Sequence, residues 1–260
     1  MKLDLKGKRA LVSGGTHGIG KAIAIKLASE GVDIAVFSRT PERVKQAKQF
    51  LSRYDVDSIC MTADVLDKKS FSEVENAIKE RWGGVDIVIN NVGGGGRWGS
   101  PDFLETSDVV WREVLDKNLT SAVKYSKMFL PYMLENDWGR VVTITSIYGK
   151  QAGGRPWFNV AKTAQTTLMK NLAINPTYAS ANITFNTVAP GGIWIPNTGW
   201  EVMKKEDPNK FNSFIKSNFP RGSMGKPEEV ANVVVFLCSP QASLINGASI
   251  SADGGESVYF

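Results

Sequence analysis

The chain has one histidine, His17, and only two cysteines, Cys60 and Cys238, among its 260 residues. This set excludes a disulfide framework, a four-cysteine zinc site and a His-rich site, and we expect no metal site. The single histidine also leaves little room for a Ser-His-Asp triad. Both cysteines stand in apolar runs, so they are predicted to be core thiols.

Long apolar runs are missing as well, since no stretch reaches the roughly 18 residues of a membrane span. The start, MKLDLKGKRALVSGG, has no signal-peptide core. We therefore expect a cytoplasmic protein with no membrane partner. The net charge is only +5, and no basic run is interleaved with aromatics, so no nucleic-acid partner is expected. The basic excess suits an anionic ligand, or else only solvated helix faces.

Short apolar runs alternate with helical patterns along the whole chain, without a linker or a repeat. Several runs are nearly continuous in valine and isoleucine, as in strands buried on both faces. The alternation predicts a Rossmann-type α/β fold, a doubly wound parallel sheet in three layers, as a single domain over residues 1–260. A substrate-covering insertion is expected at about residues 194–221. The predicted strands are Arg9–Ser13, Asp33–Phe37, Ser58–Thr62, Asp86–Asn90, Arg140–Thr145, Ile183–Val188 and Ala248–Ser251, and helices should begin near Gly18, Pro41, Lys68, Asp108, Pro156 and Pro227.

A glycine-rich turn, Ser13-Gly14-Gly15-Thr16-His17-Gly18-Ile19-Gly20, follows the first predicted strand and leads into a helix. Glycine permits positive φ and lets backbone N–H groups approach a pyrophosphate at the positive end of the helix dipole. Three glycines alone would also suit a plain structural turn. The strand before them and the helix after them favour a dinucleotide site.

The end of the second predicted strand distinguishes the two nicotinamide cofactors. An acidic residue there would bind the ribose 2′-hydroxyl of NAD. This chain has Ser38 followed by Arg39, whose guanidinium could bind a 2′-phosphate, with His17 or Lys21 as helpers. We therefore expect NADP, with NAD as the less favoured cofactor. Alternatively, Arg39 is a surface arginine that opens a loop.

Nearly the whole chain resembles the short-chain dehydrogenase/reductase family. The matching segments are Ser13–Gly20, Ala63-Asp64-Val65, Asn90-Asn91-Val92-Gly93, Trp111 with Asn118-Leu119, Asn186 with Pro190-Gly191-Gly192-Ile193, Pro227-Glu228-Glu229-Val230-Ala231 and Asp253-Gly254-Gly255. The resemblance implies cofactor contacts from Gly14, Thr16, His17, Gly18, Ile19, Gly20, Ser38, Arg39, Asp64, Val65, Asn91, Gly93, Lys162, Pro190, Gly191 and Ile193.

Reductases of this family carry a serine at the end of the fifth strand and a tyrosine four residues before a lysine. Ser146 and Lys162 match the serine and the lysine, and Asn118 matches the asparagine that holds a water beside the lysine. The residue four before Lys162 is Phe158. Since positions i and i+4 share a helix face, a ring without a hydroxyl stands where a phenol should face the substrate. The usual proton donor to the alkoxide is missing.

Three explanations of Phe158 stay open. The site is rebuilt around Tyr148 as a substitute acid, the chain is a Tyr-to-Phe inactivated variant, or it is a pseudoenzyme that binds NADP(H) without turnover. The bulky segment Arg155-Pro156-Trp157-Phe158-Asn159 is unusual throughout, which favours a native departure over a single engineered change. Of the three explanations we favour the rebuilt site. A C=C reductase, in which water supplies the proton, is a further alternative. Ile195 also departs from the family, which commonly has a threonine there at the nicotinamide end.

Four tryptophans are expected in loops at the carboxyl rim of the sheet: Trp98, Trp157, Trp194 and Trp200. Arg97 and Arg155 each adjoin one of them and could bind a carboxylate or phosphate, unless these loops only cover the site or join subunits. We expect an NAD(P)-dependent oxidoreductase that interconverts a carbonyl and a hydroxyl on a small substrate with an acidic group. The resemblance implies a homotetramer packed through long helices, here Asp108–Glu135 and Pro156–Ala179.

Overall fold

The computed structural model describes residues 1–259, and its seven strands form one parallel sheet in the order β3-β2-β1-β4-β5-β6-β7. This arrangement confirms the predicted Rossmann-type α/β fold, and the predicted strands agree with the observed ones to within two residues at each end. The strands are β1 (Arg9–Val12), β2 (Asp33–Ser38), β3 (Ser58–Thr62), β4 (Ile87–Asn90), β5 (Gly139–Ile144), β6 (Ile183–Pro190) and β7 (Ser249–Ala252).

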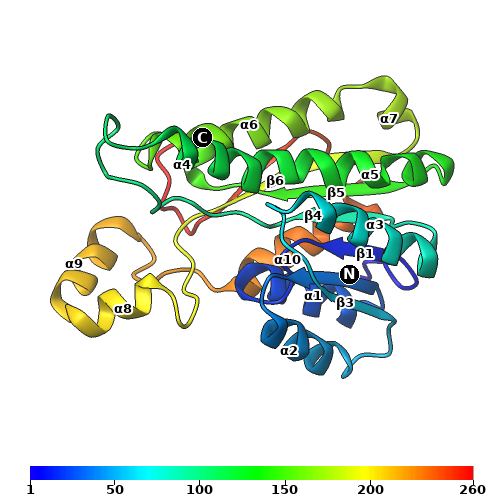
Figure 1. The fold of residues 1–260 in the computed structure, drawn as a ribbon, viewed down its shortest axis with the longest axis horizontal. Coiled ribbons are helices and arrows are strands. Elements are labelled where there is room, and N and C mark those ends of the chain that lie inside the picture. The colour runs from blue at the N-terminus through cyan, green and yellow to red at the C-terminus, as the bar shows by residue number, and fades with distance from the viewer. Residues whose placement is uncertain (260) are drawn as a thin grey trace.

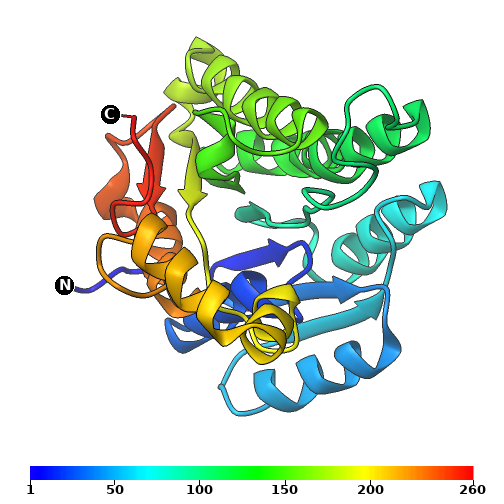
Figure 2. The same cartoon turned by 90° about the vertical axis from the view of Figure 1, so that its left-hand side faces the viewer.

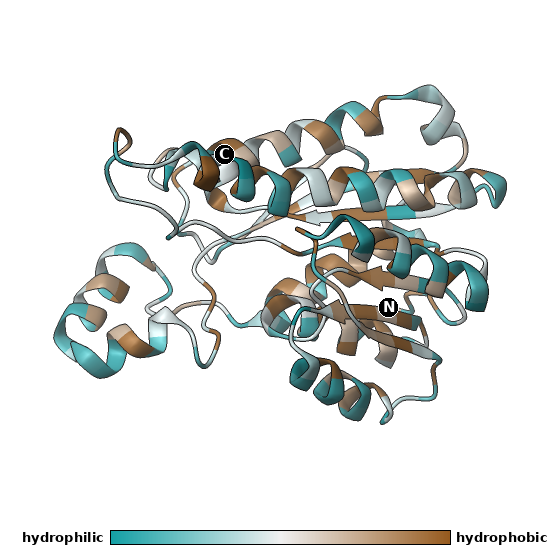
Figure 3. Ribbon diagram, in the orientation of Figure 1, coloured by the Kyte–Doolittle hydropathy of each residue, from teal (hydrophilic) through white to brown (hydrophobic). Residues whose placement is uncertain are grey.

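Helices cover both faces of the sheet (Figure 1). One hydrophobic cluster lies beneath α1 (Gly18–Ser29), α2 (Pro41–Leu51) and α10 (Pro227–Cys238). A second lies on the opposite face, beneath α3 (Lys68–Trp82), α5 (Ser121–Glu135) and α6 (Pro156–Ala173). The central strands β4, β5 and β6 are buried along their whole length. Figure 3 shows brown, hydrophobic residues gathered on the strands between the helices. Such burial on both faces explains the continuous apolar runs in the sequence.

Both helices expected to be long are interrupted. The first consists of α4 (Asp108–Leu115), a π-helical turn η1 (Asp116–Thr120) and α5. The second ends at Ala173, so the expectation that it continues to Ala179 was wrong. Proline has no N–H and disfavours helix in the residue before it, and Pro176 instead begins the short helix α7 (Pro176–Ser180).

The segment after β6 forms a separate pair of helices, α8 (Gly199–Glu206) and α9 (Pro208–Asn218), within the insertion expected from the sequence. Figures 1 and 2 show this pair projecting from the body of the fold, outside the helical layers. Phe211, Phe219 and Met224 form its small core, against which Trp194 and Trp200 pack. Among residues 1–259, no helix is both long and apolar enough to cross a membrane.

The two cysteines differ in burial. Cys238 on α10 is fully buried, as expected for a core thiol. Cys60 is only half-buried, so the expectation of a second core thiol was wrong. The reason is that β3 is an edge strand of the sheet, with no neighbouring strand on one side.

Candidate functional site

The glycine turn between β1 and α1 presents backbone N–H groups to the carboxyl edge of the sheet. Gly14 and Gly18 have φ angles of +65° and +54°, in the left-handed region that glycine reaches without strain. No side chain caps the N-terminus of α1, and no acidic residue stands in its first turn. The amides of this turn are therefore available to an anion, and the helix dipole favours one there.

Asn91, directly after β4, holds the glycine turn in place. Its Nδ2 donates to the carbonyl oxygens of Ser13 at 2.9 Å and Gly14 at 3.3 Å. Ser13 Oγ in turn accepts from the backbone N–H groups of Asn91 and Val92 at 2.9 and 3.0 Å. A Cβ at Gly20 would overlap Asn91 Nδ2 and the Gly14 carbonyl, so only glycine fits this packing. The sequence reading missed the linking role of Ser13.

A cavity of about 220 Å³ lies beside the turn and brings many predicted cofactor residues together. Its basic side chains are Arg39, Arg43, His17 and Lys117, and the sequence reading had missed Arg43 and Lys117. Burial and the neighbouring cations Arg43 and Lys21 lower the pKa of His17. The other predicted residues lining this cavity are Gly14, Ser38, Asp64, Val65, Asn91 and Gly93.

Arg39 pairs with Asp64 across the mouth of this cavity, with 3.7 Å between Nη1 and Oδ2. The Arg39 side chain is 60% exposed, and such ion pairs contribute about 0–1 kcal/mol. Arg39 can therefore exchange this partner for a phosphate at little cost. Arg43 opens α2 on the same side, so two guanidinium groups are available at one place.

Lys162 lies on α6, completely buried behind the turn that follows β4. Its Nζ donates to the Ile144 carbonyl at 3.0 Å and to Gln165 Oε1 at 3.1 Å. Burial lowers the pKa of Lys162 to about 7. A Cβ at Gly93 would lie 2.9 Å from Lys162 Nζ and 2.8 Å from Asn118 Oδ1, so glycine is needed where the chain passes both side chains.

Gln165 connects Lys162 to Asn118, a link that the sequence reading missed. While Oε1 accepts from Lys162, Nε2 donates to the Asn118 carbonyl at 2.8 Å. Gln165 and Asn118 are both fully buried. Asn118 lies in the π-helical turn, and its Nδ2 donates to the carbonyl oxygens of Gly94 and Val114, each at 2.8 Å. A chain of direct hydrogen bonds thus joins the loop after β4 to the lysine.

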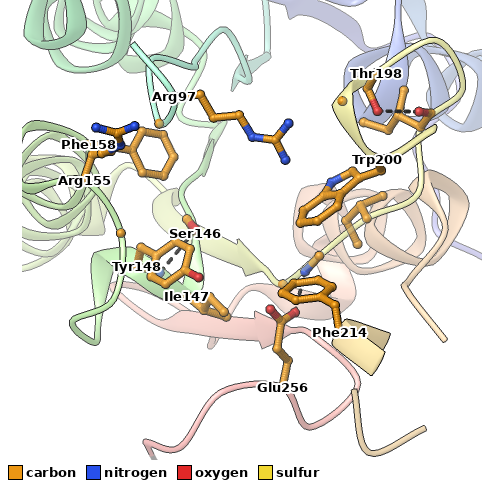
Figure 4. Close-up of a pocket in the computed structure, with 17 residues that line it drawn as sticks. Arg97, Ser146, Ile147, Tyr148, Arg155, Phe158, Thr198, Trp200, Phe214 and Glu256 are labelled. Carbon is orange, nitrogen blue, oxygen red and sulfur yellow. Dashed lines mark hydrogen bonds between the residues drawn. The ribbon is translucent and has the colours of Figure 1, made fainter. Parts of the chain in front are cut away.

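A second cavity, of about 360 Å³, opens at the end of β5 and brings together Ser146, Tyr148 and Phe158 (Figure 4). Ser146 Oγ accepts from the Tyr148 backbone N–H at 3.2 Å, which leaves its own hydroxyl proton free to donate. The Tyr148 ring lies beside Ser146 with its phenolic oxygen toward the cavity. Burial, and secondarily Glu256, raise the pKa of Tyr148.

Phe158 forms part of the wall of this cavity. It lies four residues before Lys162 on the same face of α6, with Lys162 Nζ 5.7 Å from the centre of its ring. The ring also packs on a small cluster with Val114 and Trp157. A phenylalanine side chain has no polar atom, so any proton transfer in the cavity must use another group.

The far wall of the cavity comes from the segment after β6 and from the end of the chain. Gly191, Gly192, Ile193 and Ile195 line it together with Glu256. Glu256 accepts a hydrogen bond from the Gly192 backbone N–H, while burial and the nearby Asp253 raise its pKa. The sequence reading missed Glu256, because it lies far from Ser146 along the chain.

Of the four tryptophans expected in rim loops, Trp98 and Trp194 do lie in loops, whereas Trp157 and Trp200 lie in the helices α6 and α8. Of the four, only Trp200 lines this cavity. Trp157 is fully buried, with its ring centre 5.8 Å from that of Trp111 and its Nε1 donating to the Gly95 carbonyl at 3.1 Å. Trp194 packs on Phe211, and Trp98 lies beneath Lys117. Both arginines singled out from the sequence, Arg97 and Arg155, do line the cavity.

The two cavities and the turn between them fit a dinucleotide. The basic cavity suits an adenosine end that carries phosphate, the free amides suit a pyrophosphate, and the second cavity has room for the opposite end beside Ser146. Seven predicted residues line neither cavity: Thr16, Gly18, Ile19, Gly20, Asn118, Lys162 and Pro190. Within residues 1–259, no cluster of three histidine, cysteine or acidic side chains is arranged to hold a metal ion.

The chain is similar to known proteins along almost its whole length. A family model described as enoyl-(acyl carrier protein) reductase matches residues 14–257. The 3-oxoacyl-[acyl-carrier-protein] reductase FabG of Aquifex aeolicus is 36% identical over 257 residues, covering 98% of this chain and 99% of that protein. Dehydrogenase/reductase SDR family member 4 of Bos taurus is 36% identical, covering 96% and 88%. The structure of L-sorbose reductase from Gluconobacter frateurii with NADPH and L-sorbose has a TM-score of 0.91 at 27% identity, and covers both chains fully.

Proposed function

Since the chain belongs to the short-chain dehydrogenase/reductase family, we propose that it is an NADP-dependent oxidoreductase that interconverts a carbonyl and a hydroxyl on a small substrate. The observation that supports this most is the cavity in which Ser146 and Tyr148 lie beside Gly191 and Ile193, at the carboxyl edge of the sheet. Ligands of open α/β sheets bind at this edge.

The residues for the cofactor follow from the geometry of the first cavity and the turn. The amides of Gly18, Ile19 and Gly20 bind the pyrophosphate, and Asp64 and Val65 lie at the adenine. Arg39 and Arg43 bind the 2′-phosphate by charge-assisted hydrogen bonds, which favours NADP over NAD. When bound, NADPH supplies the hydride that reduces the carbonyl.

Tyr148 supplies the proton in a site rebuilt around Phe158. The hydroxyl of Ser146 donates a hydrogen bond to the substrate carbonyl and orients it. As the carbonyl becomes an alkoxide, Tyr148 donates its phenolic proton to the oxygen. Phe158 stands in the place of the family's tyrosine and contributes only an apolar surface.

Burial of Tyr148 favours reduction over oxidation. A phenol with a raised pKa stays protonated near neutral pH, which is the form needed to protonate an alkoxide. Oxidation of an alcohol needs the phenolate, which the same burial disfavours. We therefore expect faster turnover with NADPH and a ketone than with NADP⁺ and an alcohol near neutral pH.

The test is the rate of NADPH oxidation with a panel of ketones, keto acids and enoyl compounds. Tyr148→Phe should lower kcat by about 10²–10⁴-fold, the typical contribution of a positioned general acid. Phe158→Tyr should change kcat little, because the pocket is shaped around a ring without a hydroxyl. Tyr178→Phe, on α7 and outside both cavities, is a matched control that should leave kcat unchanged.

Other outcomes separate the remaining explanations of Phe158. A large gain from Phe158→Tyr, with Tyr148→Phe silent, would identify an inactivated variant. NADPH binding without turnover of any compound would identify a pseudoenzyme. Turnover of enoyl compounds alone, unaffected by Tyr148→Phe, would identify a C=C reductase.

A homotetramer is part of the same proposal. The outer faces of α5 and α6 expose Val123 and Val160 beside Leu119 and Leu168 on a common apolar groove. Two long helices with such a surface are suited to packing against a second copy across a two-fold axis. Sedimentation equilibrium measures the assembly directly, and a monomer at micromolar concentration would contradict it.

A further inference from the structure

The cavity beside Ser146 contains more positive than negative charge, and its cations have no partners. Its charged side chains are Arg97, Arg155 and Glu256. Among residues 1–259, neither arginine side chain takes part in an ion pair or donates a hydrogen bond. Buried polar groups in proteins are usually paired, so the unpaired, half-buried Arg155, with the exposed Arg97 lining the same cavity, calls for a ligand.

Arg155 is the inner of the two cations. It is half-buried at the start of α6, beside Phe158, and its guanidinium carbon lies 5.7 Å from the centre of the Trp157 ring. Its Nη1 is buried without any hydrogen-bond partner. A buried N–H without an acceptor is unfavourable, so a bound anion that drew this guanidinium toward the cavity would relieve a penalty already present.

Arg97 is exposed at the mouth of the cavity, yet its position is defined. Its guanidinium lies over the Trp200 ring, with 4.9 Å from Cζ to the ring centre. A Cβ at Gly199 would overlap Arg97 Nη1, so the glycine leaves the space that this guanidinium occupies. Figure 4 shows the group extending across the cavity between Phe158 and Trp200.

Glu256 fixes which end of a ligand meets the arginines. It lies on the opposite wall, where the Gly192 N–H holds its carboxyl group. An anionic group is repelled from that wall and attracted to the other. Between the two walls stand Phe158, Trp200 and Phe214, which suit a short apolar stem.

We propose that the substrate is a short oxo- or hydroxycarboxylic acid whose carboxylate binds Arg155 and Arg97 while its carbonyl or hydroxyl lies at Ser146. This inference rests on the proposed function and names its substrate class. The planar guanidinium matches a carboxylate by paired N–H···O hydrogen bonds. A phosphate carries more charge and more oxygens than this largely apolar cavity can satisfy.

Calorimetric binding to the NADP⁺-loaded protein tests the proposal separately from turnover. The probes are levulinate and 5-oxohexanoate, each compared with its methyl ester, and dihydroxyacetone phosphate compared with dihydroxyacetone. The free acids should bind at least tenfold more tightly than their esters. Arg97→Met and Arg155→Met should each reduce that preference severalfold, and the double variant should abolish it while ester binding changes little. Arg53→Met, at an exposed arginine far from the cavity, is the matched control.

Three outcomes would overturn the proposal. The first is that acid and ester bind with equal affinity. The second is that the arginine variants lose affinity equally for acid and for ester. The third is that dihydroxyacetone phosphate binds more tightly than every carboxylate. Equal loss would mean that the arginines only support Trp157 and Trp200. If the free acids bind more tightly than their esters and the arginine variants remove this difference, the anion site is supported even when no probe is reduced. The absence of turnover would then count against the proposed function and not against the anion site.

Discussion

Gln165 Oε1 accepts a hydrogen bond from Lys162 Nζ at 3.1 Å, three residues along the same helix and fully inside the protein. The other end of the Gln165 amide donates to the Asn118 carbonyl. The lysine, the amide and the π-helical turn are therefore one connected unit, and a change in one of them should be felt by the others.

Gln165→Leu should lower the pKa of Lys162 further, because it removes an acceptor that stabilises the charged ammonium group. The pH profile of kcat/KM should shift to lower pH, and stability should fall by about 2–4 kcal/mol, because the Asn118 carbonyl and one lysine N–H lose their partners. Gln165→Glu should shift the profile in the opposite direction, since a carboxylate favours the ammonium. If both variants keep the wild-type profile, Gln165 serves packing alone.

The stability of the cofactor-free protein should rise with pH between about 7 and 10.5 because of Lys162. The pKa of this group is about 7 when folded against 10.5 ordinarily, so in this window the unfolded chain binds a proton that the folded one does not. Each pH unit in the window adds up to about 1.4 kcal/mol to the free energy of unfolding. Urea unfolding at about pH 7.5 and pH 9.5 measures the increase. Lys162→Met should flatten it, and parallel curves for the two proteins would exclude this origin.

The pair of substitutions Ser38→Asp and Arg39→Ala should shift cofactor preference toward NADH. One lost charge-assisted contact to a phosphate costs about 1.5–3 kcal/mol, or roughly tenfold to a hundredfold in NADPH affinity. Arg43→Ala should weaken NADPH binding in the same direction and leave NADH binding nearly constant. Fluorescence titration with both cofactors measures these constants. Equal affinity of the unmodified protein for NADPH and NADH would refute the assignment of Arg39.

Gly20→Ala should weaken NADPH binding by about tenfold or more, a loss of roughly 1.4 kcal/mol. The new Cβ would meet Asn91 Nδ2 and the Gly14 carbonyl, so the turn that presents its amides must open. Gly84→Ala is the control, because a Cβ there overlaps the Tyr132 ring in a similar way but lies outside both cavities. Similar NADPH affinities for the two variants would show that the turn tolerates the change.

The sequence predicted the fold well because its periodicity is dictated by burial. The strands that contain Ile87, Val141 and Phe185 are buried on both faces of the sheet. This burial accounts for the continuous apolar runs from which the strands were predicted. The starts of α1, α2, α6 and α10 were equally clear, since the glycine turn or a proline marks each of them. What failed were features set by neighbours far along the chain: Cys60 on an edge strand and Trp157 turned into the core.

The candidate site was predictable where local chemistry signals it, as in the glycine turn and at Ser38 and Arg39. Gln165 and Glu256 gave no such signal, because a single glutamine or glutamate acquires a role only from what packs against it. Arg43 could have been found, since it stands one helical turn after Arg39 and carries the same charge. The sequence could not show that Arg97 and Arg155 lack an acidic partner, because it does not give the positions of the carboxylates in the fold.

The π-helical turn at Asp116–Thr120 makes this part of the chain sensitive to length rather than to composition. A π turn is in effect an α-helix that accommodates one extra residue. Deleting a single residue there, for example Lys117, would restore a regular helix and rotate the preceding segment by about 100° relative to α5. The Val114 carbonyl would then turn away from the Asn118 amide that donates to it. A related chain that is one residue shorter at this point would need other contacts to hold the loop after β4. This would be so even if the rest of its sequence aligned without a gap.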